Sequence, residues 1–257
     1  MASRSARIAS LASYVLHQYD WSESSLILDL FTREQGRIAV AAKGAKRPFS
    51  QLRGVLLPFQ RLQVTLGRSP REEAPEVHTL RGADWAGGPP MLAGAALFSG
   101  FYLNELLMKL LARHDPHAAL FDAYAGTIAA LGAADDAGTQ AALRAFELVL
   151  LREIGLLPDL GTETASHRPV RAERRYLVLA DAGVVEADSD HEATLGGAHL
   201  AALEMALAAD LPSLQHVAAG ALAALRPLLR AQLHYHLGTS QLRTRQVMLE
   251  AQALGSH

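Results

Sequence analysis

The sequence predicts an α+β protein in which an N-terminal five-stranded β barrel precedes a mostly α-helical domain. Three observations support this prediction. Short β-rich runs separated by turn residues fill about the first 80 residues, a breaker run follows at 87–90, and apolar residues then recur at helical spacing. We therefore expect a barrel domain at 1–84 and a helical domain at 85–257, with a small β-hairpin inserted around 160–190.

Five runs that alternate apolar and polar residues are the expected strands. They lie at 12–19, 25–31, 37–42, 61–66 and 76–81. A closed barrel of five short strands is typical of the oligonucleotide-binding (OB) fold, an analogy at the level of the fold. After the third strand, residues 43–48 predict a cationic loop, because Gly44 and Pro48 prevent the strand from continuing.

Proline and glycine divide the rest of the chain into six expected helices. These lie at 91–113, 116–131, 140–154, 199–209, 213–236 and 240–253. Pro116 opens the second helix, Gly155 follows the third, and Pro227 predicts a kink in the fifth. Between the third and fourth helices, residues 171–188 predict a hairpin that turns at Asp181-Ala182-Gly183.

The composition limits the classes of protein that the chain can represent. It contains no cysteine, which excludes a disulfide framework and a thiolate zinc site. No apolar run reaches the roughly 20 residues that span a bilayer, and the first residues lack the apolar run of a signal peptide. We therefore expect a cytoplasmic protein without a membrane partner.

Charge is distributed unevenly along the chain. Residues 1–71 hold eleven basic and four acidic residues, a balance of +7, whereas the remainder has thirteen and twenty-two, a balance of -9. The front remains basic, at +4, when the cut is moved to residue 80. A basic front half indicates contact with a polyanion, and the acidic rear favours solubility or a basic partner.

Short motifs with known catalytic mechanics are absent, so we expect neither an enzyme nor a cofactor. At 114–117, two histidines flank an Asp-Pro pair, and Asp115 capping the next helix explains the pattern better than metal ligation. His234 and His236 point to different faces of a helix, which argues against a shared metal ion.

Five cations gather on the third strand and the loop after it: Arg37, Lys43, Lys46, Arg47 and Arg53. Such a cluster indicates contact with phosphates. Four aromatic residues are candidates for stacking on bases: Tyr19, Trp21, Phe49 and Phe59. The alternative is a solvated charged loop with its aromatic residues in the core.

Segments throughout the chain resemble the RecO family of bacterial recombination mediators. In the front half these are 21–37, 42–47 and 52–59. In the helical domain, and in the order of the family, they are 99–107, 113–121, 143–155, 237–238 and 242–245. The resemblance covers nearly the whole chain, and several blocks together are more specific than any one.

This resemblance implies an OB barrel followed by a helical domain, and a protein that acts without catalysis. The implied function is binding of single- and double-stranded DNA, strand annealing, and loading of the RecA recombinase onto DNA coated by single-stranded DNA-binding protein. The implied partners are DNA, RecR, in some systems RecF, and the acidic C-terminal tail of the single-stranded DNA-binding protein. The implied setting is the bacterial nucleoid during repair.

The resemblance also assigns roles to particular residues. Together with the cationic cluster, it gives these expected DNA-binding residues: Arg37, Lys43, Lys46, Arg47 and Arg53, with Arg243 and Arg245 as further candidates in the helical body. Of these, the four from Lys43 to Arg53 match the family's basic loop. Arg144 matches a position suited to the carboxylate of the partner tail, because a guanidinium can bind a carboxylate through two hydrogen bonds.

One departure from the family concerns zinc. Many members bind it through cysteines in the segment inserted between helices, whereas here His167 and His191 alone cannot complete a tetrahedral site, so no metal is expected. Two other functions stay open at this point. One is a nucleic-acid-modifying enzyme that uses the barrel as a substrate clamp, and the other is a scaffold whose basic loop meets an acidic protein.

Overall fold

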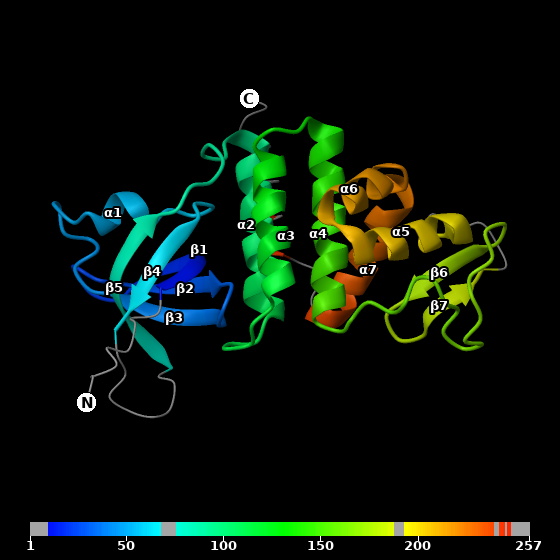
Figure 1. The fold of residues 1–257 in the computed structure, drawn as a ribbon, viewed down its shortest axis with the longest axis horizontal. Coiled ribbons are helices and arrows are strands. Elements are labelled where there is room, and N and C mark those ends of the chain that lie inside the picture. Colours follow the sequence, from blue (N-terminus) through cyan, green and yellow to red (C-terminus); the bar gives the residue numbers. More distant parts are fainter. Residues whose placement is uncertain (1–9, 68–75, 188–192, 239–241, 245, 248–257) are drawn as a thin grey trace, which may run out of the picture. The chain divides into compact units, whose positions relative to one another are not determined.

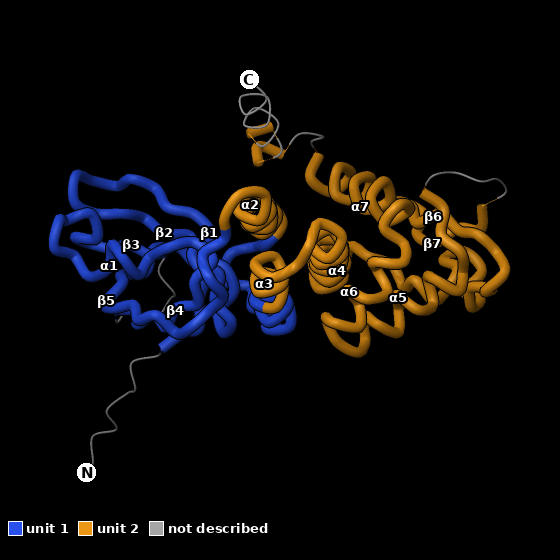
Figure 2. The backbone as a smooth tube through the Cα atoms, turned by 90° about the horizontal axis from the view of Figure 1, so that it is seen from above, with its two compact units in different colours: residues 1–92, 111–125 blue, residues 93–110, 126–257 orange. Residues whose placement is uncertain are grey.

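The computed structural model describes residues 10–67, 76–187, 193–238, 242–244 and 246–247. The chain forms two compact units (Figure 2). The first comprises Met1–Leu92 and Leu111–Ala125, and the second Ala93–Leu110 and Gly126–His257. The first unit therefore takes up a later segment, 111–125, that the composition of the sequence groups with the helices.

The first unit contains a closed barrel of five strands (Figure 1). The strands are β1 (Ser10–Asp20), β2 (Leu26–Thr32), β3 (Gly36–Ala42), β4 (Leu62–Leu66) and β5 (Val77–Trp85). Their order around the barrel is β1-β2-β3-β5-β4, with β3 and β5 parallel and the other pairs antiparallel. A short helix, α1 (Leu52–Val55), lies between β3 and β4. The prediction of an N-terminal five-stranded OB-type barrel is confirmed.

The barrel interior is filled by aliphatic side chains that alternate along the strands. Leu28 and Leu30 of β2 and Ile38 and Val40 of β3 are all fully buried. Because successive residues of a strand face opposite ways, Phe31 points to the outer surface of the sheet. There it is also buried, since its ring packs against Phe121 at a centroid distance of 5.4 Å.

Segment 111–125 covers this outer surface. Besides Phe31, the ring of Tyr14 in β1 lies 5.3 Å from that of Phe121 and 4.9 Å from that of Tyr124, and both belong to the first half of α3 (Ala118–Leu131). Burial of this cluster of aromatic rings contributes strongly to stability, because such rings bury large areas and attract one another edge to face. The aromatic cluster explains why the segment belongs to the barrel unit.

An ion-pair network accompanies the aromatic cluster. The carboxylate of Asp29 is 2% exposed; its Oδ2 lies 3.1 Å from Arg113 Nη2, and its Oδ1 lies 3.8 Å from Arg37 Nε. The backbone N–H of His114 donates to the carbonyl of Arg37 at 3.0 Å. Gly36 has a φ of +66°, and a Cβ there would clash with the carbonyl oxygen of Asp115, so this close approach requires glycine.

The second unit is built around α4 (Asp136–Glu153), whose buried residues lie between Ala141 and Leu151. The other helices that lie wholly in this unit are α2 (Gly94–Leu110), α5 (Gly197–Ala209), α6 (Leu211–Ala219) and α7 (Leu222–Leu237). Of these, α2, α6 and α7 pack against α4 (Figure 1). The predicted mostly helical domain is confirmed.

Several helix boundaries differ from the sequence prediction, and two of the differences are larger than a few residues at a helix end. The prediction of a single helix at 213–236 is wrong, because α6 ends at Ala219 and α7 starts at Leu222, whereas Pro227 lies inside α7. The helix expected to start at residue 140 starts at Asp136, since the Asp135 side chain accepts a hydrogen bond from the N–H of Gly138 at 2.8 Å. Of the helix expected at 240–253, only 242–244 and 246–247 are described.

The inserted segment forms a three-stranded sheet, one strand more than the predicted hairpin. Its strands are β6 (Arg175–Leu179), β7 (Gly183–Glu186) and β8 (Leu195–Gly196), in the order β7-β6-β8. Gln232 of α7 donates through Nε2 to the carbonyl of Val178 at 2.9 Å, which ties the sheet to the helices.

The composition of this segment does not fit a structural zinc ion. The chain has no cysteine, and in the described part no three histidine or carboxylate side chains gather as metal ligands. Among the described residues, no helix combines the length and apolar composition needed to cross a membrane.

We predict that Asp29→Ala lowers the free energy of unfolding by about 3 kcal/mol, because it leaves the mostly buried guanidinium of Arg37 without its carboxylate. Urea unfolding measures the loss. Asp122→Ala is the matched control, since its ion pair with Arg33 is exposed to solvent and should contribute much less. Equal losses in the two variants would contradict this account.

Candidate functional site

The chain between β3 and α1, residues 43–51, is termed the basic loop. It is built from consecutive tight turns, in which the N–H of Arg47 donates to the carbonyl of Gly44 at 3.1 Å and the N–H of Ser50 to that of Arg47 at 3.0 Å. Gly44 takes a φ of +74°, which glycine adopts without strain. The loop is also anchored to the β1–β2 turn, because the N–H of Lys46 donates to the carbonyl of Ser24 at 3.0 Å.

The predicted DNA-binding cations of the barrel differ in exposure. Lys43 and Arg47 in the basic loop and Arg53 on α1 are exposed. Lys46 is half-buried and its Nζ lies 2.9 Å from Asp20 Oδ1, a surface pair that solvent weakens. Arg37 lies apart from them, with its guanidinium against buried Asp29; burial lowers the pKa of Arg37, although Asp29 opposes the shift.

The aromatic candidates also separate into two groups. Phe49, in the basic loop, is 99% exposed, and Trp21 and Tyr19 are about half exposed. Phe59 is only 2% exposed, so its ring lies in the interior, and the prediction that it can stack on bases is wrong.

The C-terminal candidates lie in the second unit. Arg243 is exposed, and its backbone N–H donates to Glu105 Oε1 at 2.9 Å, while the N–H and hydroxyl of Thr244 donate to Oε2 at 2.9 and 2.7 Å. Burial by itself would raise the pKa of Glu105. The hydrogen bonds from Thr244, Arg243 and Lys109 outweigh this effect, so the pKa is lowered. Arg245 lies outside the described residues.

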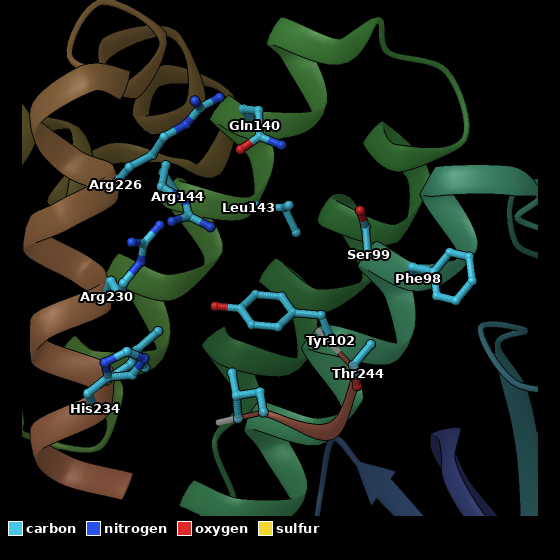
Figure 3. A pocket seen from close by; sticks show the side chains of 12 residues that line it. Phe98, Ser99, Tyr102, Gln140, Leu143, Arg144, Arg226, Arg230, His234 and Thr244 are labelled. Carbon is cyan, nitrogen blue, oxygen red and sulfur yellow. The ribbon is translucent and has the colours of Figure 1, made fainter. Parts of the chain in front are cut away.

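A second candidate site, termed the cationic pocket, lies among α2, α4, α7 and the segment at 242–244 (Figure 3). Its volume is about 390 Å³, within the range of pockets that bind small ligands. Its basic lining residues are Arg144, Arg226, Arg230 and His234, and its apolar lining residues are Phe98, Leu143, Leu233 and Leu242. The pocket thus combines positive charge with an apolar wall.

Arg144 is held at the pocket by a buried acid. Its Nη2 lies 2.6 Å from Oε1 of Glu147, a side chain with no exposed surface, and the hydroxyl of Tyr102 donates to the same oxygen at 2.6 Å. Arg144 Nε is buried and has no hydrogen-bond partner among the described residues. Burial raises the pKa of Glu147, although Arg144 and Tyr102 stabilise its charged form.

Arg226 and Arg230 were not identified from the sequence. Both are exposed on α7, one helical turn apart, and Figure 3 shows them on the side of that helix toward Arg144. Like charges at this spacing repel each other, and neither arginine forms an ion pair in the described part of the chain. In the sequence, the i, i+4 spacing of Arg226 and Arg230 indicates that they share one face of a helix, but nothing in the sequence places them beside Arg144.

The fold and the sites define a class of protein. A closed barrel with OB topology, cations on the loop after its third strand, and a helical body place the chain among proteins with an oligonucleotide-binding barrel. A family profile described as "Recombination protein O N terminal" matches residues 8–85, and one described as "Recombination protein O C terminal" matches 91–246. The chain belongs to the RecO family of DNA repair proteins.

Curated relatives agree with this assignment over nearly full length. The chain is 52% identical to "DNA repair protein RecO" of Variovorax paradoxus, with 96% of this chain and 98% of the relative covered. It is 50% identical to the proteins of the same name from Delftia acidovorans and Polaromonas naphthalenivorans, over 96% and 97% of this chain and 98% and 99% of theirs.

Glu147 should make stability depend on pH. Because its pKa is higher in the folded protein than in the unfolded chain, the folded state holds more protons between the two values. The free energy of unfolding therefore falls as pH rises from the unfolded-state pKa of Glu147 through its folded-state pKa. Glu147→Gln should remove this part of the pH dependence of stability. Urea unfolding at pH values from about 4 to about 8 measures it. Asp136→Asn, exposed on the same helix, is the control, and identical pH profiles for wild type and Glu147→Gln would refute the prediction.

Proposed function

We propose that this protein is a recombination mediator that binds single- and double-stranded DNA, anneals strands, and assists loading of RecA onto DNA coated by single-stranded DNA-binding protein. The observation that carries the proposal is the basic loop with α1, where Lys43, Arg47 and Arg53 are exposed on an anchored turn structure of an OB-type barrel. Family membership supports the repair context.

DNA binding at the basic loop would be electrostatic and indifferent to sequence. Flexible cations neutralise phosphates and release counterions, which favours association with any DNA. Lys46 would exchange its exposed partner Asp20 for a phosphate. Arg37 is better suited to a structural role, because its guanidinium already lies against buried Asp29.

The cationic pocket is the proposed site for the acidic tail of the single-stranded DNA-binding protein. Arg144, Arg226 and Arg230 provide three positive groups toward a carboxylate-rich peptide, and Leu143 and Phe98 provide an apolar surface for an aromatic side chain. Competition for this tail would free DNA from its coating protein. Arg243, exposed near the pocket-lining Thr244, is a further candidate for phosphate contact.

The mechanism that we propose uses binding energy without catalysis, in the cytoplasm at the nucleoid, with RecR and in some settings RecF as further partners. Labelled DNA incubated with purified protein should be recovered with its bonds intact. Turnover of that DNA would favour the alternative, a nucleic-acid-modifying enzyme with the barrel as its substrate clamp.

Removing the cations at 43, 46, 47 and 53 should weaken DNA binding and its dependence on salt. With about four phosphates neutralised, log affinity for single-stranded DNA should fall against log salt with a slope of about -3 in wild type. Replacing Lys43, Lys46, Arg47 and Arg53 together by alanine should flatten this slope, as measured by fluorescence anisotropy.

The control for net charge replaces Arg168, Arg171 and Arg174, three exposed residues of the second unit, by alanine. This variant should keep nearly the wild-type slope. If the control loses as much salt dependence per charge as the loop variant, DNA binding does not reside in the basic loop.

Truncating the pocket arginines should weaken tail binding. A labelled acidic peptide that ends in phenylalanine with a free carboxylate should lose about tenfold or more in affinity for Arg226→Ala and Arg230→Ala, because hydrogen bonds to charged groups contribute about 1.5–3 kcal/mol. Amidation of the peptide's carboxylate should cause a similar loss. Arg168→Ala is the control, and unchanged affinity in both pocket variants would exclude this site.

A further inference from the structure

A cavity of about 300 Å³ lies beneath the basic loop, in the barrel unit. It is lined by Gln18 of β1, Leu26 of β2, Ala45 and Lys46 of the basic loop, and Leu52, Arg53 and Leu56 in and beside α1. We term it the loop cavity. Its volume is at the lower end of the roughly 300–1,000 Å³ typical of small-molecule sites, which suits a ligand the size of one planar ring system.

The lining of the loop cavity is mostly aliphatic. Leu26, Leu52 and Leu56, together with Ala45, present methyl and methylene groups, and Ala45 and Leu56 are themselves almost fully buried. Such surfaces receive the faces of nucleobases, which are weakly hydrated. The loop cavity therefore has the character of a base-binding surface.

One amide gives the loop cavity a polar group. Gln18 donates through Nε2 to the carbonyl oxygen of Leu56 at 2.5 Å, which fixes the orientation of its side chain. Its Oε1 accepts no hydrogen bond among the described residues. A fixed amide oxygen can accept a hydrogen bond from a ring N–H or an exocyclic amine of a base.

The cations around the loop cavity identify the class of its occupant. Lys46 and Arg53 are among the lining residues, and Lys43 and Arg47 are exposed on the same loop. An aliphatic cavity flanked by cations is complementary to a base attached to a phosphodiester backbone. A neutral small molecule would gain nothing from the flanking charges.

We propose that the loop cavity takes one unpaired nucleobase of single-stranded DNA, while the phosphates on either side of that nucleotide lie on Lys46 and Arg53. This inference rests on the proposed DNA binding at the basic loop and adds a base-dependent contribution to it. A base within a duplex is stacked and paired, so the loop cavity favours single strands over double strands.

The first test varies the DNA and leaves the protein unchanged. Wild-type protein is titrated with a labelled oligothymidylate and with an oligonucleotide of the same length and charge whose residues are abasic. The oligothymidylate should bind about tenfold tighter, which is at the lower end of what one base gains by stacking on an aromatic side chain. The slope of log affinity against log salt should be the same for both ligands, because their phosphates are the same.

The second test fills the loop cavity. Ala45→Leu places a larger side chain in the cavity wall, and Leu52→Phe does so from a partly exposed position that is more tolerant of change. Both variants should bind oligothymidylate and abasic DNA with nearly equal affinity, at unchanged salt slope. Gly54→Leu is the control, because a Cβ at Gly54 meets nothing within 4 Å, and it should retain the tenfold preference.

The outcomes separate failure of this inference from failure of the proposed function. Equal binding of the two oligonucleotides by wild type would overturn the base site while leaving phosphate binding in place. A tenfold preference that persists in a folded Ala45→Leu or Leu52→Phe variant would also overturn it and assign the preference to exposed aromatic residues such as Phe49. Binding that does not depend on salt would overturn the proposed DNA binding itself.

Discussion

The parallel pairing of β3 with β5 closes the barrel, and the position of the basic loop depends on it. Ala39 lies opposite Val77 and Ala41 opposite Thr79, with the two strands running in the same direction. Parallel neighbours cannot be joined by a tight turn, so the chain that leaves β3 passes through the basic loop, α1 and β4 before it returns. The basic loop is thus part of the connection that closure requires, and its packed side supplies Ala45 to the core while its outer side carries cations.

Two buried carboxylates show how the surroundings of an arginine decide what it can bind. Asp29 in the barrel unit lies against Arg37 and Arg113, so it uses their charge to stabilise the fold. Glu147 in the helical unit holds Arg144 through one nitrogen and leaves Nε without a hydrogen bond among the described residues. The guanidinium of Arg37 is therefore held against Asp29 and is not available to a ligand. The guanidinium of Arg144, in contrast, is oriented by Glu147 at a pocket that contains Arg226 and Arg230.

Much of the fold could be predicted because its signals are local. Alternation of apolar residues located the five strands, and the breaker run at 87–90 located the change from strand to helix. The break between α6 and α7 does not coincide with Pro227, which lies inside α7, because α6 ends at Ala219, directly before Gly220. Helix propensity alone could not distinguish a helix break at Gly220 from a proline tolerated at position 227, since packing around a helix decides whether an internal proline is tolerated.

The sequence by itself determined the class of fold, the cationic character of the loop after β3, and the family, because each depends on residues that are close together in the chain. Tertiary structure alone decided that Phe59 and Arg37 are turned inward while Phe49 is exposed, and that Arg226 and Arg230 share a pocket with Arg144. The physical reason is that burial and convergence of charge arise from contacts between segments far apart in sequence, and a local pattern of residues carries no information about them.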